Sequence, residues 1–158
     1  MNPTALLIRL IDAMALTESE IRAVFQHSEE PPTDAHIQAL LLPENNTPCS
    51  ELQLLQFLDG LILERRGPPS KPAAPPTSPP TLTPNLMLKK LRIALNMREP
   101  EMLQTFLAGG KPLDKGELTA LFRKPGHKHF RPCTAATFDA FLTGVALKNA
   151  ANSPTHSD

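Results

Sequence analysis

The feature that most constrains this chain is an internal repeat. Residues of the first half recur in the same order in the second, as in the pairs Pro3 and Pro84, Leu7 and Leu88, Leu10 and Leu91, Ala13 and Ala94, Glu20 and Glu101, and Phe25 and Phe106. Further along, Pro48-Cys49 matches Pro132-Cys133, and Phe57-Leu58-Asp59-Gly60 matches Phe141-Leu142-Thr143-Gly144. Ordered matches over most of both halves predict the duplication of one structural module.

A proline-rich stretch separates the two copies. Residues 67–84 read GPPSKPAAPPTSPPTLTP and hold eight of the 18 prolines of the chain. Proline fixes φ and lacks an N–H group, so this stretch is expected to be an extended, solvated spacer. We therefore predict a first unit over residues 3–66, a linker over 67–84 and a second unit over 85–150. The polar tail 151–158 is expected to be disordered.

Each unit is expected to contain four short helices. Leucine and alanine dominate, tryptophan and tyrosine are absent, and apolar residues recur with helical spacing. Residues suited to helix starts stand before five of these segments: Thr17 with Glu20, Asp34, Asp114 with Glu117, and Ser50 or Thr134 before the fourth helix of each unit. The predicted fold is all-α, with two homologous four-helix units in tandem that pack with pseudo-two-fold symmetry.

Charge is distributed unevenly along a chain whose formal net charge is zero. Residues 1–83 carry five Lys or Arg and ten Asp or Glu, a net of −5, whereas residues 84–150 carry eleven and five, a net of +6. Opposite charge favours docking of the two halves. One unit of about 60 residues has only a small core, so mutual packing or homodimerisation is expected to support it, and the chain is expected to be a monomer or a homodimer.

Cysteine content and hydropathy favour a cytoplasmic protein. Only two cysteines occur, and no apolar run is long enough to span a membrane or resembles a signal segment. We expect no membrane association and no disulfide.

Three motifs of the second half resemble the YehS-like family of small bacterial proteins. They are Leu88-Lys89-Lys90-Leu91-Arg92-Ile93-Ala94, His127-Lys128-His129-Phe130-Arg131-Pro132-Cys133 and Phe141-Leu142-Thr143-Gly144. That family carries two copies of a helical domain of unknown function, so the resemblance implies the duplicated fold and a bacterial origin. The first half departs from the motifs, because Ile8-Arg9 stands in place of Lys89-Lys90 and Glu44-Asn45-Asn46-Thr47 lacks the basic residues. The resemblance implies no activity, cofactor or catalytic residue.

The second half also carries the sharpest candidate for a binding surface. Its members are basic or aromatic and lie on the first helix or just before the fourth: Lys89, Lys90, Arg92, Arg123, Lys124, His127, Lys128, His129, Phe130 and Arg131. The cations could neutralise phosphates of RNA or DNA while Phe130 stacks on a base. Alternatively, the surface docks on the acidic first half or on a protein partner.

Other reactive residues are interpreted as structural. His127, His129 and Cys133 offer ligand types for zinc or copper but no standard spacing, so we expect no metal or other cofactor. Cys49 and Cys133 precede a helix, where a thiol can be activated, yet burial is the favoured reading. Gly60 and Gly144 lie inside a helical pattern, which points to close packing of another helix, with a ligand approaching the bare backbone as the alternative.

A catalytic site needs a nucleophile, a base and an orienting group together, and no such combination stands out, so we assign no catalytic residues. The favoured function is a non-enzymatic interaction module that binds a protein partner. The alternatives are an RNA- or DNA-binding protein that uses the basic second repeat and, less favoured, an enzyme.

Overall fold

The computed structural model describes residues 3–28, 31–41, 49–67, 82–124 and 126–152. Within them it contains eight helices and no strands. They are α1 (Pro3–Met14), α2 (Glu18–Phe25), α3 (Asp34–Leu41), α4 (Glu51–Arg66), α5 (Pro84–Ala94), α6 (Glu99–Ala108), α7 (Lys115–Phe122) and α8 (Ala135–Asn152). The predicted all-α class is confirmed. No helix in the described part of the chain is both long and apolar enough to cross a membrane.

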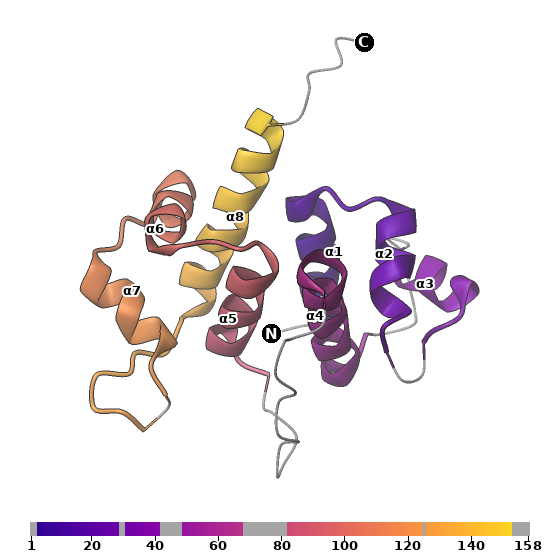
Figure 1. Cartoon of the computed structure of the whole chain (residues 1–158), viewed down its shortest axis with the longest axis horizontal. Coiled ribbons are helices and arrows are strands. Elements are labelled where there is room, and N and C mark those ends of the chain that lie inside the picture. Colours follow the sequence, from indigo (N-terminus) through magenta and orange to yellow (C-terminus); the bar gives the residue numbers. More distant parts are fainter. Residues whose placement is uncertain (1–2, 29–30, 42–48, 68–81, 125, 153–158) are drawn as a thin grey trace.

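The two units lie side by side, with α1–α4 forming unit one and α5–α8 forming unit two (Figure 1). Inside each unit the second helix packs on the fourth, as α2 on α4 and α6 on α8. Between units the first helix of each packs on the fourth helix of the other, as α1 on α8 and α4 on α5. This reciprocal arrangement is the pseudo-two-fold packing that the repeat predicted.

Equivalent residues of the two units make equivalent contacts. Phe25 and Phe57 have ring centroids 5.3 Å apart at 52°, and their counterparts Phe106 and Phe141 are 5.3 Å apart at 50°. All four rings are buried. Tilted pairs of this kind stabilise a core beyond the area they bury. The core is continuous across both units, and each unit contributes the same aromatic pair to it.

The turn after the first helix is also repeated. Ala15 and Asn96 adopt positive φ values of 53° and 52°. The residue after each donates its backbone N–H to a carbonyl five residues earlier, Leu16 to Ile11 and Met97 to Arg92, both at 3.1 Å. Left-handed residues with such bonds satisfy the last carbonyls of a helix. Duplication thus extends to details of the backbone.

Helix starts follow the caps that the sequence predicted, with one correction. Thr17 accepts from the N–H of Glu20, Ser50 from Gln53, Asp114 from Glu117 and Thr134 from Thr137. In the third helix of unit one, however, the predicted cap Asp34 is already helical, and the hydroxyl of Thr33 accepts from the N–H of His36 at 3.1 Å. Thr33 performs the role because it holds the position just outside the helix.

Gly60 and Gly144 mark where two helices touch. A Cβ on Gly60 would overlap the backbone carbonyl of Val24 in α2, and a Cβ on Gly144 would overlap that of Thr105 in α6. The close packing expected from the sequence is confirmed, because bare backbone lets the helix pairs approach.

Two cations clamp the interface between the units. The guanidinium of Arg9 on α1 lies 2.8 Å from the carboxylate of Asp139 on α8 and donates to the hydroxyl of Thr143 at 2.8 Å. Lys90 on α5, the counterpart of Arg9, pairs with Asp59 on α4, the counterpart of Thr143. Lys90–Asp59 joins a cation of the basic half to a carboxylate of the acidic half, whereas Arg9–Asp139 joins a cation of the acidic half to a carboxylate of the basic half. Position in the repeat, rather than net charge, therefore determines these contacts.

The element bounds refine the predicted linker and tail. α5 begins at Pro84 with Thr83 as its cap, so the last residue assigned to the linker is helical. Residues 68–81 and the first-half loop 44–47 lie outside the described residues. α8 continues to Asn152, so Ala151 and Asn152 are helical rather than part of a disordered tail, and residues 153–158 lie outside the described part.

Candidate functional site

The predicted basic surface is divided in the structure, because its ten residues lie in two places. Lys89, Lys90 and Arg92 lie on α5, which faces unit one. The other seven follow α7 in a segment that we call the basic loop, residues 123–131, of which residue 125 is not described. Figure 1 shows this loop on the side of unit two away from unit one. The ten residues therefore belong to two segments, which meet where Arg92 of α5 lies over the ring of Phe122, just before the loop.

Two of the three α5 cations are engaged inside the protein. The side chain of Lys90 is only 18% exposed and pairs with Asp59 across the unit interface. The guanidinium carbon of Arg92 lies 4.8 Å from the centre of the Phe122 ring, and its Nε donates to the carbonyl of Met97 at 3.4 Å. Both side chains therefore stabilise the fold. The predicted docking of basic residues on the acidic half is observed for Lys90, whereas the basic loop takes no part in it. Lys89 is exposed to solvent.

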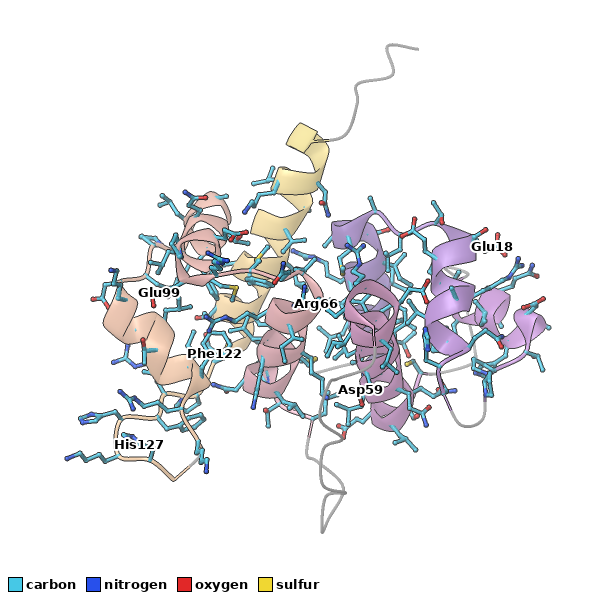
Figure 2. The ribbon with its side chains drawn as sticks, viewed as in Figure 1. Glu18, Asp59, Arg66, Glu99, Phe122 and His127 are labelled. Carbon is cyan, nitrogen blue, oxygen red and sulfur yellow. The ribbon has the colours of Figure 1, made fainter. Side chains whose placement is uncertain are left out.

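The basic loop presents its charges to solvent. Six of its side chains are exposed: Arg123, Lys124, His127, Lys128, His129 and Arg131. Phe130 among them is half-buried. In Figure 2 the loop around the labelled His127 carries its long side chains outward. Cations concentrated in so short a segment attract an anionic partner.

Backbone contacts hold the loop in shape. The N–H of His127 donates to the carbonyl of Lys124 at 3.0 Å, and the N–H of Phe130 donates to the carbonyl of His127 at 2.9 Å. Gly126 between them has a φ of 100°, which a residue with a side chain adopts only with strain. The described part of the loop is therefore a defined turn.

Asn85, near the start of α5, ties both ends of the loop to the body of unit two. Its Nδ2 donates to the carbonyls of Leu121 at 2.9 Å and Arg131 at 3.0 Å, and its Oδ1 accepts from the N–H of Cys133 at 2.8 Å. In unit one the counterpart Thr4 accepts from the N–H of Cys49 at 2.8 Å. Asn85 is a positioning residue that was not predicted from the sequence. The repeat offered a signal for it, because Asn85 and Thr4 are polar residues at matching positions.

A cleft of about 920 Å³ opens between the loop and α7. Its basic side is formed by Arg123, Lys128, His129 and Arg131, with Phe130 among them. Its other side carries three carboxylates, Glu99, Asp114 and Glu117. From the sequence, Asp114 and Glu117 were predicted only as helix caps, and Glu99 was not predicted to lie near the loop. The cleft is thus mixed in charge: most of its cations belong to the loop, the exposed Lys115 of α7 adds another, and Arg131 lies 3.6 Å from the carboxylate of Glu117.

A second hollow adjoins this cleft. It has a volume of about 180 Å³, and its lining includes Leu113, Leu121 and Pro132. Glu117 and Arg131 line both hollows, and their carboxylate and guanidinium are 3.6 Å apart. The Glu117–Arg131 pair therefore stands at the boundary of the two.

The residues considered for metal binding are not assembled as ligands. Nδ1 of His127 accepts from the N–H of His129 at 3.0 Å, and Cys133 is buried with its Sγ toward the carbonyl of Thr134 at 3.5 Å. In the described part of the chain, no three His, Cys, Asp or Glu side chains gather in a way that could hold a metal ion.

Both cysteines carry free thiols that are buried. Cys49 is 3% exposed and Cys133 is 5% exposed. Burial raises the pKa of each thiol from 9.0 to about 11, because the thiolate loses its hydration. At neutral pH both remain protonated, which agrees with the packing role expected for them.

Comparison with known proteins reveals one family. Over 100 residues the chain is 37% identical to "Uncharacterized protein YehS" of Escherichia coli (strain K12), an alignment that covers 63% of this chain and 64% of that protein. No solved structure matches the chain. The family model described as "Protein of unknown function (DUF1456)" matches twice, over residues 5–67 and 84–149, which correspond to units one and two. The resemblance seen in the sequence is thereby confirmed, and the chain belongs to the DUF1456 family as a protein with two copies of its domain.

Proposed function

We propose that this protein is a non-enzymatic interaction module that binds an acidic segment of a protein partner at the basic loop. The observation that carries the proposal is the cleft itself. Exposed cations line one side of a hollow that is large enough for a peptide, and the loop that bears them is tied in place by Asn85. A preformed site lowers the entropic cost of binding.

The mixed charge of the cleft favours a polypeptide. Glu99, Asp114 and Glu117 line the same cleft as the cations and would repel a uniformly charged phosphate chain. A polypeptide, by contrast, can place its acidic side chains on the loop and neutral or basic groups near the carboxylates. The raised pKa of both thiols disfavours these two cysteines as nucleophiles at neutral pH.

RNA or DNA is the second candidate. The observation that favours it is Phe130, which is half-buried among exposed cations, because an aromatic ring beside phosphate-neutralising groups is typical of single-strand binding. This alternative predicts affinity that falls steeply with salt.

One experiment separates the two candidates. Full-length protein is titrated with a fluorescent peptide of alternating Asp and neutral residues and, separately, with a fluorescent single-stranded RNA and DNA of equal length. The site variant is Arg123→Glu with Lys128→Glu. The control variant, Arg65→Glu with Arg66→Glu, makes the same change in net charge on exposed residues at the end of α4.

We expect the peptide to bind wild type and the control variant with equal affinity. It should bind the site variant at least about tenfold more weakly, because electrostatic attraction is replaced by repulsion. If wild type binds only the nucleic acids, with an affinity that falls with salt and is lost in the site variant, the partner is RNA or DNA rather than a protein. If the site variant binds the peptide and the nucleic acids as tightly as wild type does, both candidates are excluded.

A further inference from the structure

The smaller hollow beside the cleft is suited to an apolar side chain. Leu121 and Thr137 in its lining are buried, and Leu113 and Pro132 add aliphatic surface. Its two hydroxyl groups are paired, because Thr134 Oγ1 and Thr137 Oγ1 lie 2.9 Å apart and the Thr134 oxygen also accepts from the N–H of Thr137. A side chain that enters therefore meets the aliphatic surface of Leu113, Leu121 and Pro132, beside charged groups at the rim, and it breaks neither hydrogen bond of the two threonines.

The size of this hollow limits what it can hold. Its volume of about 180 Å³ slightly exceeds the roughly 150 Å³ of an apolar cavity that accommodates a benzene-sized molecule. One leucine or phenylalanine side chain fits, whereas a folded domain or a second helix does not.

Charge surrounds the entrance. Arg131 borders both hollows, and Lys111 lies in the lining of the smaller one and is exposed. The Arg131–Glu117 pair at the boundary is 62% and 40% exposed, so it is weak and can open for a ligand at little cost. A carboxylate of the ligand could then take the place of Glu117 on the guanidinium.

We propose that the cleft and the smaller hollow form one bipartite site, which recognises a peptide segment whose acidic residues adjoin a single leucine- or phenylalanine-sized side chain. The acidic residues contact the basic loop, and the apolar side chain occupies the hollow lined by Leu113, Leu121 and Pro132. This inference rests on the proposed function, since it specifies the segment that the same surface would bind.

Matched peptides test the proposal with the full-length protein. Each carries a fluorophore and the same acidic residues, and the position adjoining them is Ala, Val, Leu or Phe. A fifth peptide keeps Leu but replaces each Asp with Asn. Affinity is expected to rise from Ala to Leu or Phe by about tenfold or more, because burial of such a side chain is favourable, and to fall sharply in the Asn peptide.

A variant locates the apolar contact. Leu113→Asn places an amide in the hollow and is expected to erase the difference between the Leu and Ala peptides. The Arg123→Glu and Lys128→Glu variant is expected to weaken all the acidic peptides alike. If Leu113→Asn does not fold, the peptide series still decides the question.

The outcomes distinguish this inference from the function on which it rests. Equal affinity of the Ala, Leu and Phe peptides would overturn the bipartite site and leave acidic-peptide binding intact. If none of the five peptides binds saturably, both proposals fail.

Discussion

Gly144 in α8 lies directly against the backbone carbonyl of Thr105 in α6, and Gly60 in α4 lies in the same way against Val24 in α2. Since Val24 and Thr105 occupy matching positions of the repeat, the same contact sets the approach of the second and fourth helices in both units. A side chain at either glycine would separate two helices that share a core.

Replacing Gly144 with alanine is therefore expected to lower the free energy of unfolding. Forcing extra volume into a closely packed contact costs about 1–3 kcal/mol, and the better helix propensity of alanine offsets at most about 1 kcal/mol of this. Urea denaturation followed by circular dichroism measures the change.

Gly116 offers the matched control, because it also lies in a helix but a Cβ there would only reach ordinary contact with Asp114, at 3.4 Å. Gly116→Ala should leave stability unchanged or raise it by up to about 1 kcal/mol. Equal effects of the two substitutions would argue against the close contact.

The pairing of Arg9 with Asp139 predicts a coupling between the units. In a double-mutant cycle of Arg9→Met and Asp139→Asn, the coupling energy is expected to be about 0.2–1 kcal/mol, because both side chains are partly exposed. Added salt should reduce it. Strictly additive single-mutant effects at low salt would show that the contact contributes nothing.

Asn85 is expected to control the order of the basic loop. Asn85→Ala removes three hydrogen bonds and should lower stability by roughly 2–4 kcal/mol, with faster amide exchange at Cys133 and in residues 126–131. Asn85→Thr copies unit one and keeps an acceptor for the N–H of Cys133, so its effect should be smaller. If amide exchange in residues 126–131 is the same in wild type, Asn85→Ala and Asn85→Thr, this role of Asn85 is excluded.

Cysteine ionisation predicts how stability varies at alkaline pH. The thiol pKa is raised from 9.0 to about 11 on folding, so the unfolded state loses these protons first. The thiol contribution to stability is fully present below pH 9 and declines between pH 9 and about 11, by at most about 1.4 kcal/mol per pH unit for each thiol. Unfolding free energies of wild type and the Cys49→Ala, Cys133→Ala variant should converge over this range, and parallel curves would contradict the shift.

What the sequence predicted depended on local signals. Caps such as Thr17 and Asp114 and the buried faces of the helices are encoded by short-range spacing, the repeat is visible by comparing the two halves, and the structure agrees with all three. The pairing of Lys90 could not be predicted, because its partner Asp59 is brought to α5 by α4 only in the folded chain. Glu99 reaches the cleft for the same reason, since it is distant in sequence from the loop that it faces.

The reciprocal helix pairing has a consequence for partner choice. Each unit carries a cation on its first helix, Arg9 or Lys90, and an oxygen acceptor at the matching position of its fourth, Asp59 or Thr143. Two copies of the same unit could therefore satisfy each other much as unlike units do, with Arg9 meeting Asp59. These polar groups therefore do not by themselves distinguish a pair of unlike units from a pair of like units, whereas the covalent link raises the effective concentration of each unit near the other unit of its own chain.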